Sequence, residues 1–404
     1  TRYAAGPAAA PAATYTMDGP RTRYRIETPS GVWVPLSPIA QELLQLVRQP
    51  LSQRTPVGYQ SAWLEQYEPN RTCYLTEDLR AELHPLGRSP VSDAPAGTFV
   101  RQILKRFKVD LSYGSSRLEG NTYTRADTER LLNSGVPAEK ASTVDTQMIL
   151  NHMAALEYLV HLPHPVKLTV PLLSQVHALL ADGLLTDPAD CGRLRQCPVG
   201  IHGSLYHPLP ALAAIAPQLE RVLGTANAIE DPFEQSFFLT VHLPYLQPFV
   251  DVNKRVARLI ANLPFFAHNL CPMSYLDLPT ELYTAGLLAV YEFNRVELLR
   301  DVFVWAYGRS CQEFVARRKE MIAPDPFRLR YRTPLSHAVA ALIRALAPID
   351  DTTVRAHLPL GIAPADVPAF IRLVQTEFRS LNSANVVRFG VRPLEYEAWL
   401  HRER

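Results

Sequence analysis

The residues best suited to chemistry gather in one short stretch, QPFVDVNKRVAR, at positions 247–258. It lies between two apolar segments, EQSFFLTVHLPYL and VARLIANLPFFAH, which predict two helices packed in a core. Pro248 ends the first of these helices, so the polar residues stand at the start of the second. These polar residues are Asp251, Asn253, Lys254, Arg255 and Arg258.

The start of this second helix is suited to binding an anion. Its first backbone N–H groups have no partner within the helix and carry partial positive charge. Lys254 and Arg258 lie four positions apart on one face, and Arg255 lies three positions from Arg258. Cations in a first turn oppose the helix dipole by about 0.3–1 kcal/mol each unless an anion compensates them. A solvated basic helix end is the alternative, but the flanking apolar helices favour an anion site.

This stretch resembles the signature of the Fic (Fido) family, H-x-F-x-[DE]-G-N-G-R-x-x-R. Two further segments follow the order of the family. SSRLEGN at 115–121 resembles its inhibitory helix, [ST]-x-x-x-E-[GN], and the segment 192–210 resembles its target-docking flap. The Gly and β-branched content of 192–210 predicts a β-hairpin. Three motifs in family order make the resemblance specific over about 95–310. The matching signature residues are Phe249, Asp251, Asn253, Arg255 and Arg258.

The resemblance implies a role for each matching residue. Asp251 would hold Mg²⁺ at the phosphates of ATP, and Phe249 would fix the loop in the core. Other signature residues would bind the nucleotide phosphates, and Lys254, which stands where the signature has a glycine, would add its charge. This nucleotide-binding set is Asn253, Lys254, Arg255 and Arg258.

The resemblance also implies a reaction and its control. AMP would pass from ATP to a Ser, Thr or Tyr hydroxyl of a protein docked on the flap at 192–210. Glu119 would pair with Arg258 and block the productive pose of ATP. The resemblance leaves a homodimer open.

The signature departs from the family at three positions. The family's histidine is the general base for the target hydroxyl, and here Gln247 stands in its place. A carboxamide has no useful basicity near neutral pH, and loss of a general base costs roughly 10²–10⁴ in rate. The sequence is consistent with either a natural or an introduced Gln247. Val252 and Lys254 replace the two glycines, and because valine disfavours positive φ we expect an ordinary backbone conformation at 252.

Composition narrows the class of protein. The 404 residues carry a net charge of +2 and are 47% hydrophobic, which excludes a disordered chain or a polycation that coats nucleic acid. The longest apolar runs fall short of about 18 residues, so no membrane helix and no membrane partner are expected. The five cysteines form no CxxC pair, which favours a reduced, cytoplasmic setting.

We predict a mainly α-helical chain in four parts. An Ala/Pro-rich tail covers 1–20, a mixed region 21–95 that ends in a linker at 89–97, a Fic-like helical bundle 96–320, and a small helical domain 321–404. Within the mixed region we expect a hairpin in RYRIETPSGVWVPL and a helix whose buried face carries Ile39, Leu43, Leu44 and Val47. The stripe Tyr59, Trp63 and Tyr67 is expected to pack on a core. The helices of the bundle are expected at 99–109, 125–133, 143–161, 170–181, 209–223, 232–243, 254–268, 280–293 and 295–316.

The C-terminal domain has the outline of a winged helix. Helices are expected at 335–346, 351–358 and 364–381, and NVVRFGVRPLEYEAW predicts a strand pair. The third helix carries only Arg372 and Arg379 against Asp366 and Glu377, which argues against nucleic acid as a partner.

Three functions follow, in order of preference. The first is a Fic-type adenylyltransferase that uses ATP and Mg²⁺, is inhibited by Glu119 and is impaired at Gln247. The second is a pseudoenzyme that binds nucleotide or protein without transfer. The third is a transcription regulator linked to a Fic domain.

Overall fold

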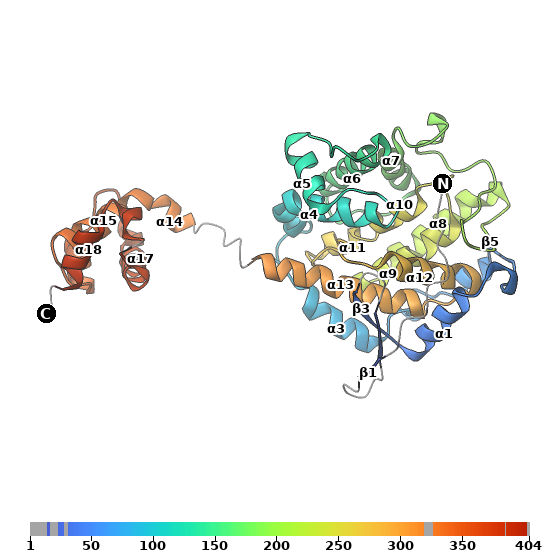
Figure 1. Cartoon of the computed structure of the whole chain (residues 1–404), viewed down its shortest axis with the longest axis horizontal. Helices are drawn as coiled ribbons and strands as arrows, with labels where there is room; N and C mark the ends of the chain where they lie inside the picture. The colour runs from blue at the N-terminus through green and yellow to red at the C-terminus, as the bar shows by residue number, and fades with distance from the viewer. Residues whose placement is uncertain (1–13, 17–22, 28–30, 319–325, 384, 402–404) are drawn as a thin grey trace. The chain divides into compact units, whose positions relative to one another are not determined.

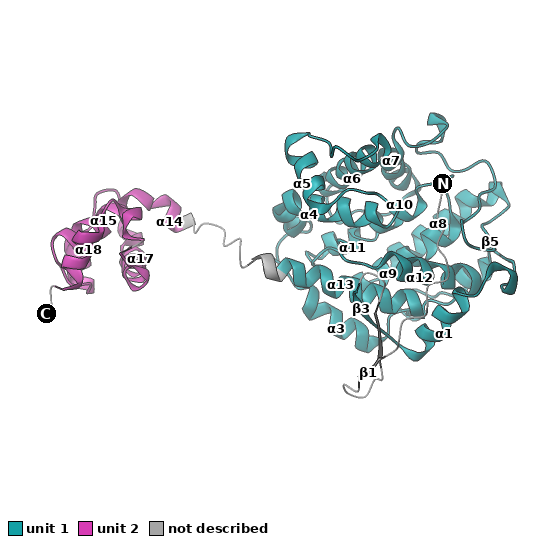
Figure 2. Cartoon of the chain, in the orientation of Figure 1, with its two compact units in different colours: residues 1–315 teal, residues 316–404 magenta. Residues whose placement is uncertain are grey.

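The computed structural model divides the chain into two compact units, Thr1–Val315 and Ala316–Arg404 (Figure 2). The region 31–95 lies in the same unit as the helices that follow it. The segment 89–97, expected as a linker, is held against that unit, because Gly97 N–H donates to the Phe266 carbonyl at 2.9 Å. The expected tail at 1–20 lies mostly outside the described residues. The structure describes residues 14–16, 23–27, 31–318, 326–383 and 385–401.

The first unit is built from helices, which confirms the predicted mainly α-helical class (Figure 1). Side-chain oxygens of Thr124, Ser142 and Thr169 cap three helices and accept the first free backbone N–H groups. The helices are α1 (Pro38–Val47), α2 (Ser61–Glu65), α3 (Glu77–Gly87), α4 (Thr98–Arg117), α5 (Arg125–Ser134), α6 (Thr143–His161), α7 (Val170–Ala181), α8 (Ile215–Ala228), α9 (Pro232–Leu246), α10 (Asn253–Ile260), α11 (Leu263–Ala267), α12 (Thr280–Phe293) and α13 (Glu297–Arg318), with 3₁₀ turns η1 (Leu51–Gln53), η2 (Pro188–Asp190) and η3 (Leu212–Ala214).

Most of the predicted helices are confirmed, and the bounds of α6, α7 and α12 agree with those expected. The helix expected at 254–268 is divided into α10 and α11. Its break coincides with Asn262, whose amide nitrogen donates to the carbonyls of Arg258 and Met273 at 3.1 Å each. Helix α4 runs eight residues further than expected and brings Ser115 into the core.

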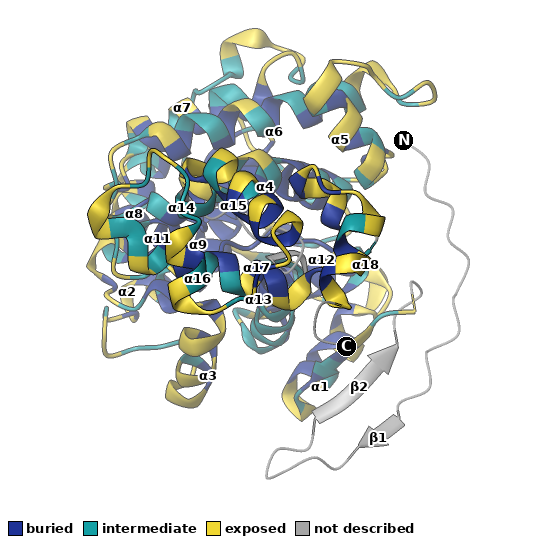
Figure 3. Cartoon of the chain, turned by 90° about the vertical axis from the view of Figure 1, so that its left-hand side faces the viewer, coloured by how far each residue is buried: buried dark blue, intermediate teal, exposed yellow. Residues whose placement is uncertain are grey.

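Helix α9 is the centre of this unit. Every residue of α9 except Gln235 is buried, as expected of a helix that is apolar on all sides. It packs against α8, α10, α11 and α12, whereas α5, α6 and α7 keep one exposed face (Figure 3). Because α9 ends at Leu246, the core fixes the chain directly before position 247.

The aromatic stripe of the N-terminal region packs on α9, as predicted. Trp63 meets Tyr245 edge to face at 5.0 Å between ring centroids, and Tyr67 lies 4.7 Å from Phe238. The predicted amphipathic helix is α1, although Ile39 is exposed and Ala40 takes its place in the core.

The strands form two small sheets. In the first, the antiparallel order β1 (Thr14–Thr16), β2 (Arg23–Glu27) and β3 (Trp33–Leu36) confirms the expected N-terminal hairpin. In the second, β4 (Val57–Gly58) pairs in parallel with β5 (Tyr206–His207). The hairpin expected at 192–210 is therefore wrong. That segment pairs with a distant strand and is otherwise held by turns and by the side chain of Arg195.

The second unit has its own apolar core and is helical among its described residues. The predicted wing is wrong: Val386 and Val391 are buried in that core, and Gly390, at φ 67°, ends a 3₁₀ turn. Pro393 then starts a helix where the second strand was expected. Its elements are α14 (Pro326–Arg330), α15 (Arg332–Arg344), α16 (Asp351–Ala356), η4 (Pro364–Asp366), α17 (Val367–Ser380), η5 (Val386–Phe389) and α18 (Pro393–Leu400).

Across the described residues of both units, none of the helices is both long and apolar enough to cross a membrane.

Candidate functional site

The loop between α9 and α10 has a left-handed backbone at both ends. Gln247 adopts φ 51° and Val252 adopts φ 65°. The ordinary conformation expected at Val252 is therefore wrong. A β-branched residue in this region is strained by on the order of 1–3 kcal/mol. The strain is tolerated because the Val252 side chain is buried and its N–H donates to Oδ1 of Asp251 at 2.6 Å.

Asn253 and Phe249 hold the middle of the loop. The amide oxygen of Asn253 accepts the Phe249 N–H at 2.9 Å, and its amide nitrogen donates to the Phe249 carbonyl at 2.9 Å. The Phe249 ring is fully buried and stacks on His177 at 3.9 Å between centroids. Asn253 was expected to bind phosphate, but its side chain is used in supporting the loop.

Gln247 has a fixed side chain as well as a fixed backbone. Its amide oxygen accepts from the Asn253 side chain at 2.8 Å, and its amide nitrogen donates to the Pro244 carbonyl at 2.7 Å. The group at position 247 is thus oriented by two hydrogen bonds but has no basicity with which to take a proton.

Arg258 and Glu119 form a buried ion pair. Nη2 of Arg258 lies 2.7 Å from the Glu119 carboxylate, and the Arg258 side chain is fully buried. Lys254 binds the other carboxylate oxygen at 2.7 Å. Burial by itself raises the pKa of Glu119, but Arg258 and Lys254 outweigh burial and lower it to about 2. The carboxylate is therefore charged at neutral pH.

A chain of hydrogen bonds extends from Arg258 behind this pair. Nε of Arg258 donates to the Ser115 hydroxyl at 2.9 Å, which lies 2.8 Å from Nε2 of His152. Because the Ser115 oxygen accepts from Arg258, its own proton is free to bond Nε2 of His152. The proton of the neutral imidazole is therefore assigned to Nδ1, which lies 3.3 Å from the Met148 carbonyl. Burial lowers the pKa of His152 to about 3, in agreement with a neutral imidazole.

Arg255 differs from Arg258 because it lacks a comparable set of partners. It is 7% exposed, and its buried Nη1 has no hydrogen-bond partner. Burial lowers its pKa, since the desolvated charge is incompletely compensated. It lies in the first turn of α10, whose start is not capped by any side chain. An unpaired buried guanidinium at an uncapped helix start is suited to binding an anion.

Asp251 is the carboxylate available for a metal. It is exposed at the loop, and only its Oδ1 is used by the Val252 N–H. Within the described residues there is no group of three or more His, Cys, Asp or Glu side chains able to hold a metal. One carboxylate fits Mg²⁺ that is held mainly by substrate phosphates and water.

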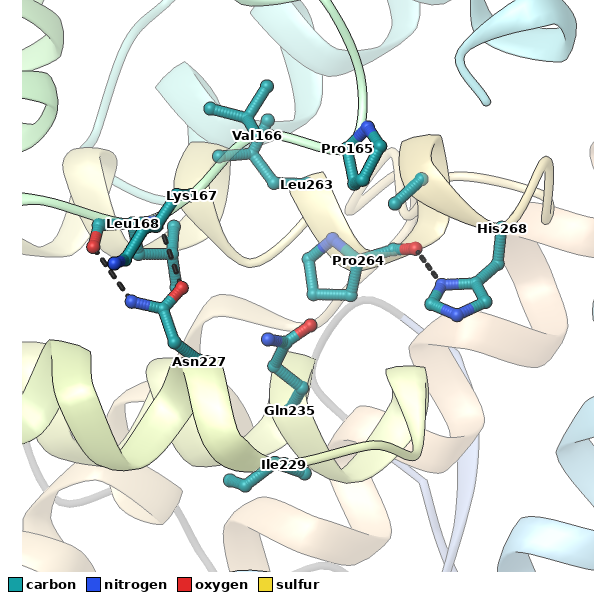
Figure 4. Close-up of a pocket in the computed structure, with 11 residues that line it drawn as sticks. Pro165, Val166, Lys167, Leu168, Asn227, Ile229, Gln235, Leu263, Pro264 and His268 are labelled. Atoms are coloured by element: carbon teal, nitrogen blue, oxygen red, sulfur yellow. Dashed lines mark hydrogen bonds between the residues drawn. The ribbon is translucent and has the colours of Figure 1, made fainter. Parts of the chain in front are cut away.

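A separate cavity of about 360 Å³ lies on the same unit, away from this loop (Figure 4). Its polar side chains serve the local backbone. Asn227 exchanges two hydrogen bonds with the backbone of Leu168, and Nδ1 of His268 lies 2.9 Å from the Pro264 carbonyl. The residues of the expected nucleotide site contribute nothing to its lining.

Sequence reasoning missed several residues that shape the site. Arg195 donates to the Gln247 carbonyl, His177 stacks on Phe249, and the Tyr283 hydroxyl accepts from Arg258 at 3.3 Å. His177 lies on the apolar face of its helix, which is the signal that it is buried. The position of Arg195 in the sequence gives no comparable signal, because its side-chain partners lie up to 52 positions away.

Comparison with known proteins places the loop in a family. Residues 167–265 match the sequence model of the Fic/DOC family, a narrower span than the 96–320 expected. The protein adenylyltransferase Fic of Drosophila persimilis is 26% identical over 152 residues, which is 37% of this chain and 30% of that protein. The protein adenylyltransferase fic-1 of Caenorhabditis briggsae is 26% identical over 198 residues, 46% of this chain and 36% of that protein. This chain spans about a third of the length of these curated relatives.

A solved structure shares the fold. A Fic family protein from Desulfovibrio desulfuricans G20 superposes with a TM-score of 0.51 at 20% identity, over 77% of this chain and 92% of that one. At this identity the likeness concerns the fold alone. The chain therefore carries a Fic domain within a mainly helical fold.

Proposed function

We propose that this chain is a Fic-type adenylyltransferase whose activity is limited in two ways. Glu119 occupies its phosphate site, and Gln247 replaces its base. The nucleotide is ATP, and the acceptor is a Ser, Thr or Tyr hydroxyl of a protein docked on 192–210. The similarity to proteins named adenylyltransferases supports this class of reaction.

The observation that carries the proposal is the excess of positive charge at the start of α10. Lys254, Arg255 and Arg258 converge there, and Glu119 is the carboxylate that pairs with two of them. The buried Nη1 of Arg255 remains without a partner. A chain of phosphates would supply the acceptors that Arg255 lacks.

Glu119 acts as an internal competitor in this proposal. Its carboxylate accepts from Arg258 and Lys254 at 2.7 Å each, the contacts that a terminal phosphate would need. Two anions cannot share these donors without repulsion, so bound ATP and the Glu119 contact exclude each other.

The transfer itself requires a base. The hydroxyl oxygen of the target attacks the α-phosphorus, the bond from that phosphorus to the β-phosphate oxygen breaks, and pyrophosphate leaves. Arg255 and the N–H groups of α10 stabilise the charge that develops on the phosphate oxygens. The proton of the attacking hydroxyl must pass to a nearby group, and the Gln247 carboxamide cannot take it.

Mg²⁺ fits this site beside Asp251. When bound, it would neutralise phosphate charge and orient the leaving group. The contribution of the chain is the single exposed carboxylate of Asp251, positioned next to the strained Val252.

The second candidate is a nucleotide-binding pseudoenzyme. The two hydrogen bonds that fix the Gln247 side chain favour it, because they give this residue a supporting role in the loop. In this case the site would bind ATP or a protein partner, but no AMP would be transferred.

Self-labelling with α-labelled ATP tests the proposal. The Glu119→Gly/Gln247→His variant should label itself, because imidazole titrates near neutrality and can accept the proton. The matched control Glu119→Gly/Gln247→Asn lacks a base and should bind ATP equally well without labelling. Robust labelling by the unmodified chain would show that another group is the base. No labelling by the histidine variant, with ATP binding intact in calorimetry, would favour the pseudoenzyme.

A further inference from the structure

The segment 192–210 is anchored to the loop 247–252 at several points. The guanidinium of Arg195 donates from Nε to the Gln247 carbonyl at 2.6 Å, and the Arg195 N–H donates to the Pro248 carbonyl at 2.9 Å. On the far side of the loop, His177 bonds the Gly192 N–H at 2.9 Å through Nδ1 and lies 3.3 Å from the Asp251 carbonyl through Nε2.

Arg195 also holds its own segment together. Nη1 donates to the Cys197 carbonyl at 3.1 Å, and Nη2 donates to the Leu209 carbonyl at 2.6 Å. The side chain of Arg195 therefore connects the start and the end of the segment 192–210 to each other and to the residue at position 247.

The environment of Arg195 indicates that its side chain orients the backbone rather than neutralising a carboxylate. The residue is 2% exposed, and its guanidinium donates to the backbone carbonyls of Gln247, Cys197 and Leu209. Burial lowers its pKa, so the charge is kept at a cost in desolvation. A planar group with donors in a fixed fork can satisfy three carbonyls in different directions, which a lysine ammonium cannot do from the same position.

Position 247 needs such support. Its backbone is left-handed, at φ 51° and ψ 63°, although it is not a glycine. The direction of the side chain at 247 follows from this backbone conformation. A peptide that rotated towards the ordinary region would turn the side chain away from Asn253 and Pro244.

We propose that Arg195 is a positioning residue that fixes the left-handed backbone of position 247 and couples it to the segment 192–210. Arg195 thereby orients the side chain at position 247 towards the site. It also orders the segment 192–210, on which a target would dock. The consequence for transfer rests on the proposed adenylyltransferase function, whereas the effect on the loop does not.

The first experiment measures the loop directly in the full chain. Hydrogen–deuterium exchange of the Phe249 amide, which is buried and bonded to Asn253, reports opening of the loop. Arg195→Lys should raise this exchange at least about tenfold, while the amides of α6 keep their protection. The control is Arg101→Lys, because Arg101 also donates to a backbone carbonyl, that of Ala96, but does not contact the loop. Unchanged exchange at Phe249, or a rise spread over the whole unit, would overturn the proposal.

The second experiment measures the consequence for transfer in the Glu119→Gly/Gln247→His background. Adding Arg195→Lys should slow self-labelling by about ten- to a hundredfold and leave the Kd for ATP within about twofold. A fall in ATP affinity that accounts for the whole loss of rate would mean a general structural role and would overturn the positioning role. If the background variant does not label at all, the adenylyltransferase proposal fails, and the exchange measurement alone decides the role of Arg195.

Discussion

Two regions of the molecule contain a carboxylate clamped by two cations. In the first unit, Glu119 binds Lys254 and the fully buried Arg258. In the second unit, Glu377 binds Arg328 and Arg388, whose side chains are 40% and 46% exposed. Both carboxylates are mostly buried, but the first is paired with a fully buried arginine, whereas both arginines of the second reach solvent.

The difference distinguishes the proposed phosphate site from a structural contact. Beside Glu119 lies a further buried cation, Arg255, with an unpartnered Nη1, and Val252 next to it is held in a strained backbone. Beside Glu377 both arginines reach solvent and balance its charge. Surplus buried charge and backbone strain fit the phosphate site that we propose at the start of α10.

The largest effect expected from this comparison is on stability. Arg258→Met should lower the free energy of unfolding of the first unit by about 3–5 kcal/mol, because it leaves Glu119 and Ser115 without their buried partner. Arg328→Met should cost the second unit about 1 kcal/mol or less, since a half-exposed arginine is replaced and Arg388 remains. Urea denaturation followed by circular dichroism measures both. Equal costs would remove the distinction between the two clamps.

The next effect is on ligand affinity. Arg255→Ala should weaken binding of ATP–Mg²⁺ by about 1.5–3 kcal/mol, roughly ten- to a hundredfold in Kd, as expected for a charged hydrogen bond. Arg388→Ala, which removes a cation from the other clamp, should leave the Kd unchanged. Isothermal titration calorimetry compares the two variants. Unchanged affinity in Arg255→Ala would remove the phosphate site from the start of α10.

A smaller effect concerns the strained backbone. Val252→Gly should destabilise the first unit by about 1–3 kcal/mol less than Val256→Gly, because glycine relieves the left-handed strain only at position 252. Both valines are 2% exposed, so the loss of buried surface is similar. Thermal unfolding of both variants makes the comparison, and equal losses would show that position 252 stores no strain.

A further effect expected is a dependence on pH. The pKa of Glu119 is lowered to about 2 in the folded chain, so its ion pairs stabilise the fold fully above the ordinary value of 4.5. This contribution is lost as the pH falls from 4.5 towards 2. The difference in Tm between the unmodified chain and Glu119→Gln should therefore be constant from pH 7 to 5 and shrink below pH 4. A difference that does not change with pH would mean that Glu119 is not charged in the clamp.

The sequence by itself determined the helical class of the fold and the charged residues of the candidate site. The period of apolar residues and the cap residues Thr124, Ser142 and Thr169 fixed the helices, because both signals are local. The resemblance of two motifs to the Fic family implied an ion pair between Glu119 and Arg258 across 139 positions, and the structure brings these two side chains together.

The tertiary structure decided what depends on distant contacts. The pairing of Val57–Gly58 with Tyr206–His207 replaces the expected hairpin, and strands of two residues leave no pattern in a sequence. The wing expected near Val386 became a 3₁₀ turn and a helix because its valines are buried in the core of the second unit. The left-handed Val252 and the bond from Arg195 to Gln247 also came only from the structure. Local backbone preference opposes the left-handed Val252, and a separation of 52 positions conceals the bond between Arg195 and Gln247, so only the packed core could impose them.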